Sequence, residues 1–167
     1  MATNKYFNKS YVREQDLIED LTVEAIQING LDLKYLPRTL VNLDSIFKED
    51  MISIFDRAYT IEGYIRETEG FGGAHEAISK FGLEIRDTVT FDISKRRFME
   101  EIGNVENTTR PMEGDLIYFP ITESYFEVRY VNTTNPFYQL GKNFVFELKC
   151  ELFEYSSERF NTGISEI

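Results

Sequence analysis

The chain has 167 residues and a formal net charge of −11, because 29 acidic residues outnumber 18 basic ones. An acidic surface repels phosphate, so the composition disfavours tight, sequence-independent binding of nucleic acid. A single cysteine excludes an intramolecular disulfide, and 42% hydrophobic residues suffice for the core of one domain. Without a signal peptide or an apolar run of bilayer length, we expect a soluble cytosolic product.

The N-terminal part of the chain predicts an extended arm followed by a helix. Residues 1–15 are polar and aromatic without a clear period, which is typical of a loose terminus and also of an arm that reaches a neighbour. Residues 17–29 predict a helix with apolar side chains at helical spacing: Leu17, Leu21, Ala25 and Ile28. Asp16 is a suitable N-cap with Glu19 three residues later, and Gly30 is a suitable C-cap.

The next segment predicts strands and loops. Residues 31–36 alternate between apolar and polar side chains, as in a short strand, and Pro37 ends the pattern. Residues 38–50 predict a loop with a charged tip. Residues 51–65 are ambiguous between strand and helix, and their aromatic and β-branched content favours the extended form.

The middle of the chain contains a glycine cluster that predicts a flexible hinge: Gly70, Gly72 and Gly73. A short helix over residues 74–81 is expected after it. Residues 84–93 alternate in polarity and predict a half-buried strand. Residues 95–102 predict another short helix, and residues 103–111 a polar loop.

The last third of the chain has the clearest strand pattern. Residues 115–121 and 125–131 predict a hairpin, with turn chemistry at residues 122–124. After a loop over residues 132–141, residues 144–152 alternate as a long strand whose parity slips at its end. These patterns predict a mainly β (α+β) fold, with an antiparallel β-barrel or sandwich core of long strands plus short helices and extended loops.

The domain organisation follows from the same patterns. Residues 1–15 are expected to form an N-terminal arm, residues 16–156 a single β-rich domain, and residues 157–167 a C-terminal tail.

The side chains of common catalytic and metal sites are scarce. The single histidine, His75, excludes a Ser-His-Asp triad and multi-histidine metal sites. Cys150 lies on the apolar side of a predicted strand, as a core residue does. Acidic pairs such as Glu67 and Glu69 are better explained as solvated surface. We expect no catalytic residue, metal or cofactor, and the alternative is a hydrolase that uses carboxylates in an unfamiliar arrangement.

Five separated blocks occur in one order between about residues 17 and 156: residues 25–38, 79–90, 113–120, 126–128 and 135–141. The third block reads Glu-Gly-Asp-Leu-Ile-Tyr-Phe-Pro, and the last reads Asn-Pro-Phe-Tyr-Gln-Leu-Gly. In this order the blocks resemble the neck, or head-closure, protein of contractile-tailed bacteriophages of the T-even type.

The resemblance implies a virion structural protein at the head–tail junction, assembled in the host cytoplasm. Its copies are expected to form a homo-oligomeric ring, a hexamer, between the portal-proximal adaptor protein and the tail terminator protein. The ring would complete the filled head, help to retain DNA and dock the tail. Packaged double-stranded DNA would pass through its channel without specific binding. The resemblance implies no enzyme activity and no membrane contact.

Three groups of residues are candidates for this role. The aromatic and proline residues Tyr118, Phe119, Pro136, Phe137 and Tyr138 are candidates for a subunit or partner interface. For Phe137 and Tyr138, core packing is the alternative. The basic cluster Lys95, Arg96 and Arg97 is either a solvated face or a contact for an acidic partner or DNA. The glycine hinge would carry a movable channel loop. Another connector role, as adaptor or terminator, and a non-viral small-ligand-binding β domain are the alternatives.

Overall fold

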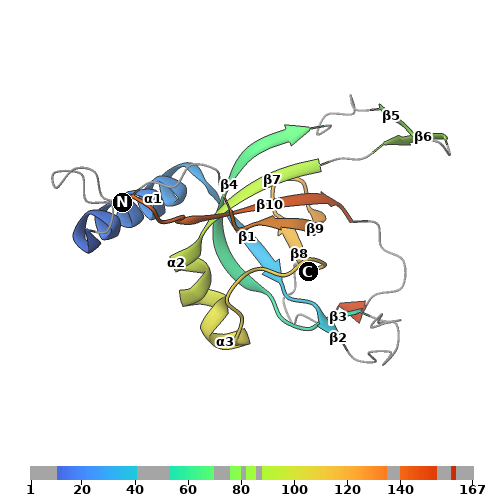
Figure 1. Cartoon of the computed structure of the whole chain (residues 1–167). Coiled ribbons are helices and arrows are strands. Elements are labelled where there is room, and N and C mark those ends of the chain that lie inside the picture. The colour runs from blue at the N-terminus through green and yellow to red at the C-terminus, as the bar shows by residue number, and fades with distance from the viewer. Residues whose placement is uncertain are drawn as a thin grey trace.

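A closed barrel of six antiparallel strands, in the order β1-β4-β7-β10-β9-β8, forms the centre of the fold (Figure 1). The strands are β1 (Leu31–Leu36), β4 (Tyr59–Glu69), β7 (Thr88–Ser94), β8 (Leu116–Phe119), β9 (Ser124–Asn132) and β10 (Val145–Leu152). The computed structural model describes residues 11–40, 53–69, 76–79, 82–85, 88–134, 140–153 and 159–160. The predicted mainly β fold is confirmed, in the barrel form.

Alternating side chains explain why these segments form a barrel. In β7 and β10 every second side chain points into the core: Val89, Phe91, Ile93, Phe146, Leu148 and Cys150 are buried. The ring of Phe91 lies 6.2 Å, centroid to centroid, from both Phe119 and Phe126. Burial of each large apolar side chain contributes about 1.5–3 kcal/mol, so this interior is the main source of stability.

The barrel closes where β1 pairs with β8, and Asp115 reinforces this short seam. The seam has three Cα pairs, from Lys34 with Tyr118 to Leu36 with Leu116. Immediately before β8, the buried Asp115 carboxylate accepts hydrogen bonds from three groups: the Arg38 N–H at 2.8 Å, the Met112 N–H at 2.9 Å and the Tyr35 hydroxyl. Two backbone donors and a tyrosine hydroxyl therefore converge on one carboxylate at the seam.

Burial dominates the ionisation of this group. It raises the pKa of Asp115, and the hydrogen bonds from Arg38, Tyr35 and Met112 oppose that rise. The pKa of Tyr35 is also raised, first by burial and then by the nearby Asp115 charge. The Asp115 N–H also donates to the Met112 carbonyl at 3.4 Å, so Asp115 closes the turn that precedes β8.

A helical segment covers the apolar interior. It consists of α2 (Lys95–Phe98), one π-helical turn η1 (Met99–Gly103) and α3 (Asn104–Glu106). Phe98 is fully buried, with its ring edge-on to Tyr35 at 5.6 Å and to Phe146 at 5.8 Å. The predicted helix over residues 95–102 is confirmed and continues to Glu106, into residues expected to form a loop.

The other elements surround the barrel (Figure 1). The long helix α1 (Val12–Asn29) lies at one end of the molecule, and the hairpin of β5 (Glu76–Ser79) and β6 (Gly82–Ile85) lies beyond the ends of β4 and β7. A small sheet joins β11 (Arg159–Phe160), β3 (Ser53–Phe55) and β2 (Thr39–Leu40).

Several expected boundaries were wrong. The first helix begins at Val12, with Tyr11 as the N-cap, so Asp16 does not cap it and residues 12–15 do not belong to an extended arm. Residues 76–79 form a strand instead of part of a helix. The expected strand over residues 84–93 is divided between β6 and β7.

Other boundaries were confirmed. The predicted strand over residues 31–36 is β1, and the predicted hairpin is β8 paired with β9. The extended form favoured for residues 51–65 is confirmed by β3 and β4. The last long strand, β10, ends at Leu152, where the parity slips.

Candidate functional site

The basic cluster Lys95, Arg96 and Arg97 forms the start of the helix that covers the barrel. Ser94, the last residue of β7, is buried and extended, and the chain turns there from strand into helix. Because this turn lies next to α1 and β4, the two arginine side chains reach carboxylates on both elements.

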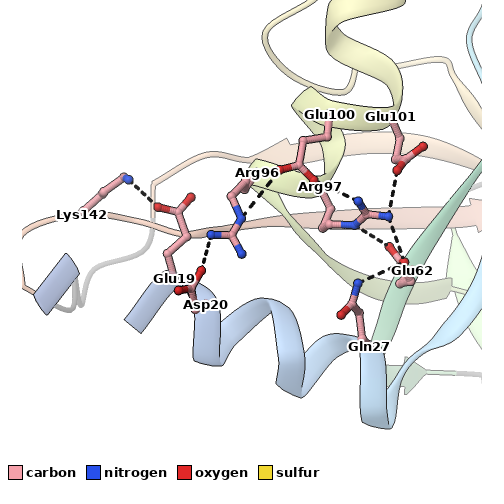
Figure 2. A network of polar contacts seen from close by, with 9 residues as sticks. All are labelled: Glu19, Asp20, Gln27, Glu62, Arg96, Arg97, Glu100, Glu101 and Lys142. Carbon is pink, nitrogen blue, oxygen red and sulfur yellow. Dashed lines mark hydrogen bonds and ion pairs between the residues drawn. The ribbon is translucent and has the colours of Figure 1, made fainter. Parts of the chain in front are cut away.

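Each arginine bridges two elements (Figure 2). Arg96 pairs with Asp20 of α1 and, at 4.0 Å, with Glu100 of η1. Arg97 pairs with three carboxylates at 2.9 to 3.1 Å: Glu62 of β4, Glu100 and Glu101. The two cations therefore hold α1, β4 and the covering helix together.

The network continues along α1. Lys142 Nζ lies 2.7 Å from Glu19 Oε2, and the Gln27 side chain donates a hydrogen bond to Glu62 at 3.3 Å. Within the network drawn in Figure 2, five carboxylates face three cations, so its net charge is negative.

Ionisation reflects these pairings. Hydrogen bonds to Glu62 and Glu100 raise the pKa of the Arg97 guanidinium. Partial burial raises the pKa of Glu62, but hydrogen bonds, mainly from Arg97, outweigh it and leave that pKa lowered. Partial burial, and then repulsion from Lys142, lowers the pKa of Lys95, whose Nζ lies 4.9 Å from the Phe146 ring centroid.

A contact between this cluster and an acidic partner or DNA stays a prediction. Such a contact would compete with the intramolecular partners of Arg96 and Arg97. No local sequence pattern predicts these ion-pair partners, because Asp20 lies 76 residues from Arg96 and Glu62 lies 35 residues from Arg97.

The predicted interface residues separate into three groups. Phe119 is 5% exposed and packs in the barrel core against Phe91 and Phe126, so its ring is buried in the isolated chain. Tyr118 is half-buried, with its ring 5.1 Å from that of Tyr125. The remaining candidates lie outside the described residues: Pro136, Phe137, Tyr138, Gly70, Gly72 and Gly73.

The helix α1 exposes most of the apolar stripe that the sequence predicted at helical spacing. Leu17, Leu21 and Ile28 are 57%, 51% and 72% exposed, whereas Val23 and Ile26 are buried against the barrel. The helix has two apolar stripes, and only tertiary structure determines which one packs inward.

A groove lies between α1 and strands β4, β7 and β10. It has a volume of about 650 Å³ and is lined mainly by α1 side chains together with Tyr64, Asp92 and Val145. Sequence analysis missed this groove, because no local pattern reveals that α1 packs loosely against these strands.

Within the described part of the chain, no helix is long and apolar enough to cross a bilayer.

Asp92 is the buried charge of this groove. One of its carboxylate oxygens accepts from Arg66 Nε at 2.9 Å and pairs with a second Arg66 nitrogen at 2.7 Å. Arg66 also pairs with Glu147 at 2.8 Å. The other oxygen, Oδ1, is buried and has no hydrogen-bond partner among the residues that the structure describes. Burial raises the pKa of Asp92, and the Arg66 charge opposes that rise.

One known family matches the chain over nearly its full length. The T4 neck-protein family, described as virus neck protein, matches residues 2–166. The match includes the barrel, its covering helix and α1, and it agrees with the blocks of sequence that resemble phage neck proteins. The chain belongs to the virus neck protein family, whose members are structural proteins of the head–tail junction of the virion.

Proposed function

We propose that copies of this chain form a ring, a hexamer, between the portal–adaptor complex and the tail terminator. The ring completes the DNA-filled head, helps to retain the DNA and docks the tail. The observation that carries this proposal is the family match over residues 2–166. The role is structural, and the protein is not an enzyme.

The closed barrel determines how such a ring can form. Each of the six barrel strands has hydrogen-bonded neighbours on both sides over part of its length, and within the described residues few sheet edges are left to which a neighbouring subunit could add a strand; residues 64–69 of β4, which pair only with β7, are one. Subunits would instead associate through side chains, helices and projecting hairpins. A ring needs head-to-tail contacts between two different patches of each copy, repeated until the circle closes.

The charge of the chain supports a channel for DNA. At −11 per copy, a ring of six presents a strongly acidic surface to phosphate. The positive charges of Arg96 and Arg97 are already paired with carboxylates of the same chain, so they do not form a basic patch that would attract phosphate. DNA would therefore slide through the channel without sequence-independent adhesion.

Particles made without this chain test the proposal. Electron microscopy should show filled heads that lack tails and lose DNA on storage, and supplying the intact chain in trans should restore tailed particles. Complete, infectious, tailed particles made in the absence of the chain would refute the proposal. Arrest before packaging would place the chain earlier in head assembly and would also contradict it.

A further inference from the structure

We infer that the outer face of α1, with the groove beneath it, docks a basic, apolar segment of a neighbouring protein in the particle. This neighbour is a different protein, and not a second copy of the chain. The inference rests on the proposed function and identifies one of the contacts that this function requires.

The first evidence is a continuous apolar surface. Leu17, Leu21 and Ile28 follow helical spacing, so they form one stripe along α1. Leu21 belongs both to this stripe and to the lining of the groove, and the half-exposed ring of Tyr64 faces it from β4. The stripe and the groove together offer one concave apolar site to a partner.

The second evidence is the charge around this surface. The helix α1 contains five acidic residues and one basic residue. Glu14 and Glu24 lie three residues from Leu17 and Leu21, respectively, so they flank the stripe. Neither carboxylate has an ion-pair partner within the described residues. In contrast, Glu19 pairs with Lys142 and Asp20 pairs with Arg96. With five acidic residues against Arg13 alone on α1, the rim of the site carries an excess of negative charge.

The third evidence is an unused acceptor within the groove. Asp92 is 8% exposed and lines the groove, and within the described residues its Oδ1 atom has no hydrogen-bond partner. A buried acceptor without a partner is unfavourable. An occupant that brings a donor, such as an arginine or lysine side chain, would supply that partner.

These features together select the occupant. A second copy is a poorer occupant, because within the described residues its clustered cations Arg96 and Arg97 already pair with carboxylates of the same chain. DNA is repelled by the same rim and has no apolar surface for the groove. A protein segment with apolar side chains and flanking cations matches all three features. Its apolar side chains fit the stripe and the groove, and its cations pair with the acidic rim and with Asp92 Oδ1.

Photo-crosslinking in assembled particles tests this inference. A photoreactive amino acid replaces Leu21 in the full chain, and a control chain carries it at Ile121, an exposed apolar residue in the β8–β9 turn. Mass spectrometry of purified particles then identifies the crosslinked peptide. We expect the probe at position 21, and not the probe at position 121, to label a different particle protein within a peptide rich in apolar and basic residues.

Three results would overturn the inference: labelling only of a second copy, labelling of the same peptide from position 121, or no labelling in particles that contain the chain. The proposed function fails differently, because the chain would then be missing from purified particles altogether.

Charge reversal gives an independent measurement. Replacing both rim carboxylates, Glu14→Lys with Glu24→Lys, should reduce the yield of tailed particles about tenfold, whereas the exposed control Glu113→Lys should not. Both substitutions lie on solvent-exposed sites, so the purified variants should unfold at the same temperature as the parent. Undiminished yield from the double variant would contradict a basic occupant.

Discussion

Asp115 has a greater effect on stability than its neighbours, because it accepts hydrogen bonds from three groups at the closing seam of the barrel. Asp115→Ala leaves the partly buried Arg38 and Met112 N–H groups without the Asp115 acceptor. We expect it to lower the free energy of unfolding by about 3 kcal/mol, measured by urea denaturation. Glu113→Ala, two residues away and exposed, is the control and should change it by less than about 0.5 kcal/mol. Equal effects from the two variants would contradict the role of Asp115 at the seam.

Asp92 makes stability depend on pH in a defined direction. Burial raises its pKa, so the folded chain binds this proton more tightly than the unfolded chain does. Its contribution to stability is therefore complete below the unfolded pKa of about 3.9 and is lost as pH rises through the folded pKa. Asp92→Asn removes this titration, so we expect the variant to gain stability relative to the parent between pH 4 and pH 7. A relative loss over that range, in urea unfolding, would show that Arg66 dominates instead.

The helix α1 depends on close backbone contact at its C-terminal end. A Cβ atom on Gly30 would lie 2.7 Å from the Gly63 carbonyl oxygen of β4 and would also meet the Ile26 oxygen. Both atoms are backbone, so the helix end would have to move away from the barrel. Gly30→Ala should cost about 2 kcal/mol in urea unfolding. The adjacent exposed variant Asn29→Ala should be nearly neutral, and a neutral Gly30→Ala would show that this end of α1 is free to shift.

Ion pairs hold the rest of this helix, because α1 buries few apolar side chains. The pairs Arg96–Asp20 and Lys142–Glu19 are exposed, so each contributes at most about 1 kcal/mol and weakens in salt. In 1 M NaCl we expect amide hydrogen exchange in α1 to quicken about fivefold relative to β7. Arg96→Ala should make the exchange rate of α1 less sensitive to salt. An exchange rate in α1 that does not change with salt would contradict a role for these ion pairs.

Local patterns predicted the elements better than their partners. Alternation identified β1, β8, β9 and β10, because one face of each strand is buried. It did not reveal that β1 closes the barrel against β8, since pairing depends on contacts distant in sequence. The helix expected over residues 74–81 failed because β5 is set by its pairing with β6 rather than by its own propensity.

The candidate site was predictable only in part. The basic cluster was visible in the sequence, but its ion-pair partners lie on α1 and β4 and depend on the tertiary fold. The exposure of Leu17 and Leu21 was not predictable either, because spacing alone does not show which stripe of a helix meets the barrel.

At the scale of the whole molecule, an acidic closed barrel with one loosely held, acidic and apolar helix suits an assembly protein. The closed barrel supplies a subunit with few free sheet edges among the described residues. The helix supplies an apolar stripe that is exposed to solvent in the isolated chain. The hairpin of β5 and β6 extends the reach of the subunit beyond the barrel ends (Figure 1).

The most direct test is a cryo-electron microscopy map of the head–tail junction in intact particles that contain this chain. The account predicts a ring of six closed barrels around the DNA axis, between the adaptor and the tail terminator, with the outer face of α1 against a different protein. A junction whose density accommodates no copy of this barrel would contradict it.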